Sequence, residues 1–267
     1  MTMRRVAIVL LLLLFGVLLA AEHVAPHSYA TQFRDAPNAR PSRSFPLGTD
    51  ALGRDRLSRL IYGGRGSMLL APAAALLSVG MALAISLLAG CLGRWWERAA
   101  MAMADLSLSM PWLFALLAVR AMLPLNAPPV ATMLVTFGLL GLLGWAAPSR
   151  VMLASVKRHL QSDFVLLARA SGCRRSRLAL VHLAPNLLPL ALAQFLVTTP
   201  IFLMAEATLG LLGLGVPEPL PSWGGLLQEL ENLPSITASP WILAPLLVLI
   251  AVVSLFHMLV SADPYSV

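Results

Sequence analysis

Long runs of apolar residues recur along this chain, and they constrain its fold more than any other feature. The chain has 267 residues, of which 58% are hydrophobic and only 12% are charged, whereas a soluble domain carries about 25% charged residues. A helix of roughly 20 apolar residues crosses the hydrocarbon core of a bilayer. The sequence therefore predicts an all-α, polytopic membrane protein, because a soluble core does not need runs of this length and number.

The apolar runs predict six membrane-spanning helices, at residues 4–21, 67–91, 101–123, 129–148, 186–212 and 240–260. We expect three parts: a first transmembrane helix at 1–21, an external polar segment at 22–66 and a five-helix core at 67–267. The basic start of the first run and its closing Ala20–Ala21 also fit a cleavable signal peptide, which is the alternative for that run.

The basic residues give the chain an orientation and limit its partners. Lysine and arginine prefer cytoplasmic loops, and with an even number of spans both termini lie on one side. The larger share of the 19 basic residues falls on that side, which predicts cytoplasmic N- and C-termini. The arginines lie between apolar runs rather than among aromatic residues, so we expect anionic lipid or acidic protein surfaces as partners and no nucleic acid.

A basic loop at 149–185 interrupts the apolar runs with the stretch LARASGCRRSRLALVHLAPN, residues 167–186. Its composition predicts a helix from about Asp163 to Ser171, a break at Gly172 with positive φ, and a second short helix over about 174–183. Leu178, Leu180 and Leu183 would anchor this second helix to the membrane. Pro185 is expected in the first turn of the fifth span. The segment would bind either anionic lipid or a cytosolic protein.

Two carboxylates fall inside predicted spans, Asp105 in the third and Glu206 in the fifth. A carboxylate within the bilayer is costly, and it is commonly paired or directed into a cavity. Each of the two could relay protons, or could form a hydrogen bond with a neighbouring helix or with a partner subunit.

Two polar segments flank spans on the predicted external side. Asp50, Arg54 and Asp55 come shortly before the second span, and they could form a local ion-pair network or contact a partner. The stretch 216–227, within a Pro/Gly-rich loop at 213–239, carries Trp223. This stretch could line a translocation path, or its tryptophan could anchor the loop at the membrane interface.

The sequence lacks the motifs of an ATPase, a metalloprotease or a serine hydrolase. A P-loop requires GxxxxGK[ST], but the only lysine, Lys157, lies between Val156 and Arg158. HExxH and GxSxG are also absent. Cys91 and Cys173 fit no metal-binding spacing. We therefore expect no enzyme activity, no metal site and no cofactor in this chain.

The stretch ARASGCRRSRLALVHLAPN resembles the cytoplasmic coupling segment of ABC importer permeases, in which small residues precede a glycine and a proline follows 13 positions later. The matching positions are Ala168, Gly172, His182 and Pro185. Leu166 and Leu167 depart from the pattern, which has an acidic and a small residue there. These departures concern the fit of the first short helix.

Two further stretches resemble one branch of that family. FPLGTDALGRDRLSRLIYGGRGSM, at 45–68, is similar to GTDxLGRDxxSRxxxGxRxS, and EATLGLLGLGVPEPLPSWGGLL, at 206–227, is similar to EAxLxxLGLGxxPPxPSWGxxL. Asp105, Pro111, Trp145 and Arg150 fall in register as well. Together these stretches resemble the C-type permease of dipeptide, oligopeptide and nickel ABC importers.

The resemblance implies a type I ABC importer permease in a bacterial inner membrane. It implies a second, homologous permease, two cytosolic P-loop ATPases that hold ATP and magnesium, and an external substrate-binding protein. The implied ATPase-coupling residues are Ala168, Arg169, Gly172, Arg174, Arg175, His182 and Pro185. The implied structural or gate residues are Asp50, Gly53, Arg54, Asp55, Asp105, Glu206 and Trp223.

The cargo expected from the resemblance is a dipeptide, an oligopeptide or a related small solute, with nickel as the alternative. A secondary transporter driven by an ion gradient would instead use Glu206 and Asp105 as ion sites, but the inverted repeats typical of that class are not apparent in the sequence. A membrane-embedded enzyme would need a nucleophile or metal cluster on facing spans, and none is apparent.

Overall fold

The computed structural model describes residues 2–122, 127–232, 236–237 and 239–261. Within these ranges the chain is helical, and the only β-structure is an isolated bridge between Thr49 and Asp55. The chain divides into two compact units. The first comprises Met1–Pro72, Val119–Phe137 and Thr199–Val267, and the second comprises Ala73–Ala118 and Gly138–Thr198.

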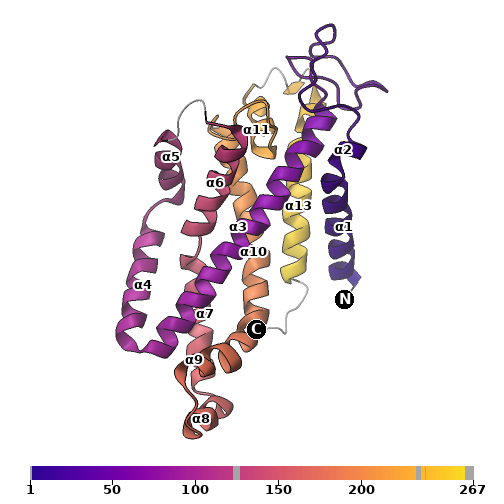
Figure 1. Cartoon of the computed structure of the whole chain (residues 1–267). Coiled ribbons are helices and arrows are strands. Elements are labelled where there is room, and N and C mark those ends of the chain that lie inside the picture. Colours follow the sequence, from indigo (N-terminus) through magenta and orange to yellow (C-terminus); the bar gives the residue numbers. More distant parts are fainter. Residues whose placement is uncertain (1, 123–126, 233–235, 238, 262–267) are drawn as a thin grey trace. The chain divides into compact units, whose positions relative to one another are not determined.

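The first unit contains an antiparallel pair of apolar helices, α1 and α13, which pack along each other (Figure 1). Its complete elements are α1 (Thr2–Leu19), α2 (Ala21–Val24), α11 (Trp223–Leu227), η2 (Gln228–Glu231), η3 (Pro240–Leu243) and α13 (Ala244–Ser261). Four helices contribute one part to each unit: α3 (Arg56–Leu92), α5 (Trp112–Met122), α6 (Pro129–Leu143) and α10 (Ala184–Leu211).

The helix α3 begins at a cap made by Asp55. The Ser58 amide and hydroxyl both donate to Asp55 Oδ2, at 3.0 and 2.5 Å, and such a side chain satisfies amides that a first helical turn leaves free. The cap lies at the end of the irregular coil that separates α2 from α3 (Figure 1). Residues 56–66, predicted as part of the external polar segment, are therefore helical.

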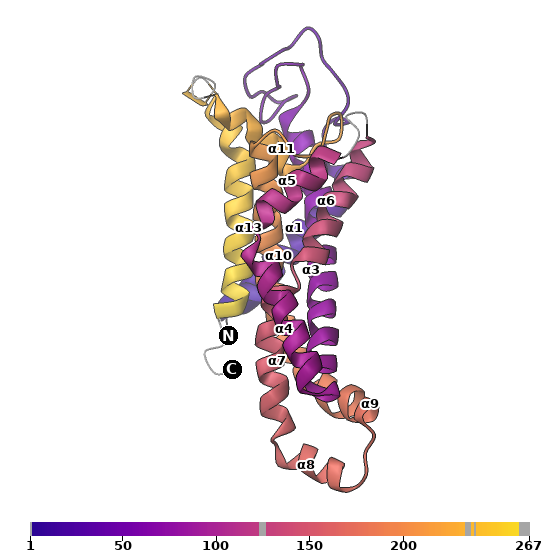
Figure 2. The same cartoon turned by 90° about the vertical axis from the view of Figure 1, so that its left-hand side faces the viewer.

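The second unit is built around α4 (Arg94–Ser109) and α7 (Ala146–Leu160), which run side by side (Figure 2). It also contains α8 (Asp163–Ala170), α9 (Arg175–Arg177) and the π-helical turn η1 (Leu178–Leu183). Val79, Ala82, Met152 and Ala191 form one buried apolar cluster in this unit.

The predicted third span, 101–123, is not one straight helix. Arg94–Ser109 and Trp112–Ala118 form a pair bent by 78°. The break has a local cause: Met110 is extended, with ψ 123°, as expected for a residue before a proline, and Pro111 has no amide hydrogen to continue the helix.

Among the described residues, four helices are long and apolar enough to cross a membrane, or five if the bent pair is one span. The four are Arg56–Leu92, Pro129–Leu160, Arg175–Leu211 and Pro240–Ser261. The predicted first span is helical as α1, but with 18 residues it is shorter than these four. The structure thus gives four or five spans where six were predicted.

Candidate functional site

The turn around Gly172 has the geometry that the sequence predicts. Gly172 has φ +76°, and its amide donates to Arg169 O at 3.0 Å, while the Cys173 amide donates to Ala168 O at 3.0 Å. These two bonds are the C-terminal capping pattern in which a left-handed residue ends a helix. The helix that they close, α8, starts after an extended Ser162 and has Asp163 in its first turn.

The second half of this segment differs from the prediction. Instead of a separate short helix over 174–183, α9 continues through η1 into α10, so that Arg175–Leu211 forms one long helix. Within the wide turn the Ala184 amide donates to Ala179 O. Pro185 lies in the first turn of α10, as predicted, but α10 continues from the π-helical turn, so the long helix itself begins at Arg175. Because proline cannot donate and crowds the preceding turn, a local widening of the helix is a reasonable accommodation.

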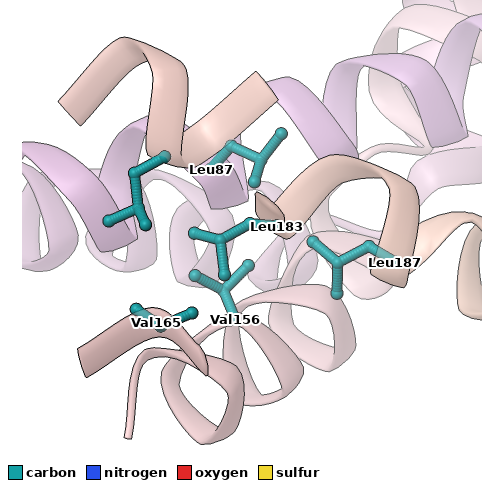
Figure 3. Close-up of a cluster of buried hydrophobic side chains, with 6 residues drawn as sticks. Leu87, Val156, Val165, Leu183 and Leu187 are labelled. Atoms are coloured by element: carbon teal, nitrogen blue, oxygen red, sulfur yellow. The ribbon is translucent and has the colours of Figure 1, made fainter. Parts of the chain in front are cut away.

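The segment is held to the rest of its unit by a buried apolar cluster. Leu87 of α3, Val156 of α7, Val165 of α8 and Leu187 of α10 converge there (Figure 3). Leu178 and Leu183 of η1 complete the cluster, and Ala168 and Cys173 pack against it. Leu178 and Leu183 are therefore core residues, which corrects their predicted role as membrane anchors.

The outer face of the segment combines arginines with apolar side chains. Arg169, Arg174 and Arg175 are exposed, and among the described residues none of the three forms an ion pair. Leu167 and Leu180 are 70% and 69% exposed. The two leucines that depart from the family pattern, Leu166 and Leu167, thus point outward and leave the packing of α8 undisturbed. His182 is half-buried, and Pro185 is exposed.

In the first unit, four charged side chains from two distant stretches form one network. Arg54 Nε donates to Asp50 Oδ2 at 2.7 Å. The guanidinium groups of Arg54 and Arg59 both bind the carboxylate of Glu218, with Arg54 Nη1–Oε2 and Arg59 Nη2–Oε1 each at 2.7 Å. The side chains of Asp50, Arg54 and Arg59 are 5, 10 and 5% exposed, whereas that of Glu218 is 57% exposed.

The network shifts the pKa values of two of its members. Burial raises the pKa of the Glu218 carboxyl, but the hydrogen bonds and charges of Arg59 and Arg54 outweigh it, so the pKa is lowered from 4.5. Burial lowers the pKa of Arg54, yet the hydrogen bonds to Asp50 and Glu218 more than compensate, and its pKa is raised. Both groups are therefore charged at neutral pH.

The other predicted residues near this network have structural partners. Asp55 caps α3 and lies 3.7 Å from His27 Nδ1. The Gly53 amide donates to Asp50 O at 3.0 Å, and Gly53 O accepts from the Phe33 amide at 2.9 Å. These contacts agree with the interpretation of this stretch as a local network.

Glu206 is 1% exposed and meets the start of α11. Its Oε2 accepts from the Gly224 amide at 3.2 Å and from Ser67 Oγ at 3.3 Å, while Oε1 is buried without a hydrogen-bond partner among the described residues. Trp223 is also 1% exposed, and its Nε1 donates to Leu60 O at 3.1 Å. The tryptophan therefore packs inside its unit, which contradicts its interpretation as an interface anchor.

Asp105 lies apart from these residues, in the second unit. It pairs with Arg150 of α7, and both side chains are about half exposed, at 56 and 50%. A neighbouring ion pair joins Glu97 of α4 to Lys157 of α7. Among the described residues no group of three or more histidine, cysteine, aspartate or glutamate side chains could hold a metal ion.

Sequence reasoning did not identify Arg59, Ser67 and Glu218 as site residues. Arg59 and Ser67 lie in the stretch 45–68, and Glu218 lies in the stretch 206–227. Arg59 and Glu218 are separated by 159 positions, and no pattern within either stretch indicates that they meet.

The chain is similar to a known protein family and to several bacterial transport proteins. The family described as "Binding-protein-dependent transport system inner membrane component" matches residues 62–262. The oligopeptide transport system permease protein OppC of Bacillus subtilis (strain 168) is 29% identical to the chain, over 88% of the chain and 75% of its own length. The di/tripeptide transport system permease protein DppC of Pseudomonas aeruginosa (strain UCBPP-PA14) is 32% identical, over 83% and 73%. The oligopeptide permease OppC of Mycobacterium bovis (strain ATCC BAA-935 / AF2122/97) is 31% identical, over 91% and 82%.

Proposed function

We propose a function from the premise that this chain belongs to the family of binding-protein-dependent transport system inner membrane components. The chain forms half of the translocation path of a peptide importer. The chain is a multi-pass membrane permease of the ABC class, not an enzyme, and this class works with ATPases and a binding protein. We propose that a second, homologous permease forms the other half, and that two cytosolic P-loop ATPases supply ATP and magnesium.

The observation that carries the proposal is the packing of the helix–turn–helix at Gly172 onto the long helices of its unit. The apolar cluster joins α8 and η1 to α3, α7 and α10, so a force on the outer face reaches three long helices without passing through a flexible loop. The unpaired arginines and exposed leucines of that face suit a protein surface with acidic and apolar groups. ATP-driven motion of the ATPases would reach α10 by this route.

A substitution pair at Gly172 tests the coupling role. A Cβ at this position meets no atom within 4 Å, so the strain of a side chain comes only from the positive φ. Valine there should cost about 1–2 kcal/mol, whereas asparagine tolerates this conformation. In the assembled transporter we expect Gly172→Val to lower peptide uptake per ATP hydrolysed by about tenfold. Gly172→Asn should retain most of it.

Reversal of charge on the outer face provides an independent test of the coupling role. Arg174→Glu combined with Arg175→Glu should reduce co-purification of the ATPases, because both side chains are exposed and the changes leave the apolar cluster intact. Normal uptake together with normal ATPase co-purification in both this variant and Gly172→Val would falsify the coupling role.

The cargo is proposed from the relatives, whose names specify oligopeptides, dipeptides and di/tripeptides. Uptake of labelled di- and tripeptides by the assembled transporter, with nickel as the competing candidate, is the direct test. Nickel uptake without peptide uptake would contradict the peptide assignment and leave the permease assignment intact.

We also propose that both termini lie in the cytoplasm of a bacterial cell, with the membrane being the inner one. In the first unit the start of α1 and the end of α13 lie at the same end of their antiparallel pair (Figures 1 and 2). This arrangement supports termini on a common side, and the bias of basic residues supports the cytoplasmic assignment.

A further inference from the structure

The geometry around Glu218 points to a carboxylate-binding site that the chain fills from within. We propose that Arg54 and Arg59 form a site for one carboxylate, and that Glu218 occupies it as an exchangeable latch. The latch would hold the segment 213–222 against the start of α3. All of these residues belong to the first unit.

The contacts of Glu218 are those of a bound carboxylate ligand. Each of its oxygens accepts from both arginines: Oε2 from Arg54 Nη1 at 2.7 Å and Arg59 Nη1 at 3.2 Å, and Oε1 from Arg59 Nη2 at 2.7 Å and Arg54 Nη2 at 3.3 Å. Two guanidinium forks on one carboxylate give strong, directional binding. By comparison, the exposed pair of Arg65 and Glu22 in this unit has one hydrogen bond among the described residues, at 2.9 Å.

The charge of the site requires this fourth member. The two arginines carry two positive charges, and Asp50 supplies one negative charge. Asp50 Oδ2 bonds to Arg54 at 2.7 Å but is 3.8 Å from Arg59 Nε, which has no hydrogen-bond partner among the described residues. Among the described residues, the Arg59 side chain donates hydrogen bonds only to the carboxylate of Glu218. Without Glu218 the two buried guanidinium groups would share the single counter-charge of Asp50, and Arg59, which is 5% exposed, would have no hydrogen-bonded carboxylate among the described residues, which is costly.

Differences in exposure identify Glu218 as the exchangeable member. Its side chain is 57% exposed, whereas those of its two arginine partners are 10 and 5% exposed. The site is therefore built into the protein, and its anion faces solvent. The stretch also departs from the family pattern at this point, because Glu218 stands where LGLGxxPPxPSWG has its first paired proline. A chain with the usual proline there would lack this internal ligand.

The latch acts close to a second buried contact. Ser222, Trp223 and Gly224 lie four to six positions after Glu218, and the Gly224 amide donates to Glu206 near the end of α10. Release of Glu218 would therefore free the segment that leads into this contact, while Trp223 would keep its own bond to Leu60 O.

Chemical rescue tests the site. In the full chain, reconstituted in lipid nanodiscs, Glu218→Ala should speed amide hydrogen exchange across 213–228 by about tenfold. Acetate in excess should return the exchange rate to within about twofold of the unsubstituted chain, because it restores one carboxylate between the arginines. Chloride at equal ionic strength and neutral acetamide should not. Glu218→Gln, which keeps the shape of the side chain, should behave like the alanine variant.

Two controls make the outcome decisive. Glu22→Ala, which opens the exposed pair with Arg65, should show no acetate response across 213–228. Arg59→Gln combined with Glu218→Ala should lose the acetate rescue, because the site itself is gone. Exchange in Glu218→Ala that equals that of the unsubstituted chain, or acetate that protects no better than chloride, would overturn the proposal. Neither outcome depends on what the transporter carries.

Discussion

At the scale of single residues, the buried polar groups of the first unit find partners far along the chain. Glu206 accepts from Gly224 and Ser67, and Arg59 donates to Glu218. A buried carboxylate or guanidinium without partners is costly. These pairings therefore explain why charged and small residues stand beside apolar spans at 45–68 and 206–227 of this chain.

Gly224 is a residue at which this arrangement leaves no room for a side chain. A Cβ there would lie 2.5 Å from Glu206 O and 2.6 Å from Glu206 Oε1. We expect Gly224→Ala to lower the free energy of unfolding by about 1–3 kcal/mol, because the backbone of α10 must shift. Thermal unfolding of the purified chain in detergent measures the effect.

The adjacent Gly225 provides the matched control. A Cβ there meets Ser222 Oγ at 3.4 Å and Val216 O at 3.9 Å, which are ordinary contacts, so Gly225→Ala should remain close to the unsubstituted chain. Equal melting temperatures for the two variants would show that α11 does not pack as closely on Glu206 as described.

At the scale of elements, the second unit connects α4 to the proposed coupling segment, α8 to η1, through α7. The pairs Asp105–Arg150 and Glu97–Lys157 lie along the two antiparallel helices, and α7 leads into α8 through Gln161 and Ser162. The predicted third span begins as α4, an amphipathic helix bound to α7. If α4 and the following part of α5 form one span, the two helices cross the membrane together.

A charge exchange between α4 and α7 tests this connection. Glu97→Lys and Lys157→Glu should each destabilise the chain through like-charge contact, and the double variant should recover most of the loss. The coupling energy should be below about 1 kcal/mol, because the two side chains are 29 and 50% exposed and water screens exposed pairs. A double-mutant cycle on unfolding stability gives this energy, and strictly additive effects would mean that the pair does not form.

At the scale of the whole molecule, the chain is a permease that works as part of a larger assembly. Its outer arginines at the coupling segment have no internal counter-charges among the described residues, while the charges around Arg54 and Arg59 balance internally. This contrast agrees with a surface that docks another subunit at one site and a self-contained latch at the other.

The orientation of the chain in the membrane can be tested by labelling single cysteines. In a chain whose Cys91 and Cys173 are replaced by alanine, a cysteine at exposed Ala51 should react with an impermeant maleimide in intact spheroplasts. A cysteine at exposed Ser176 should react only after the membrane is permeabilised. The same reactivity at both positions in intact cells would contradict the proposed orientation.

Local sequence patterns determined the fold class and the turn at Gly172. The apolar runs specified helices that can cross a membrane, and Gly172 specified a left-handed helix end because few other residues adopt positive φ at low cost. These features depend on neighbouring residues, so a linear pattern contains them. The same applies to the cap at Asp55, whose partner lies three positions away.

Only the tertiary structure decided which distant residues meet and where helices bend or continue. The capture of Glu218 by Arg54 and Arg59, the burial of Trp223 and the packing of Leu178 and Leu183 depend on contacts between segments far apart in sequence. The π-helical passage from α9 into α10 depends on packing as well as on Pro185. Hydrophobicity specifies that a residue is buried, but the partner that buries it is chosen when the helices assemble, because apolar contact is non-directional.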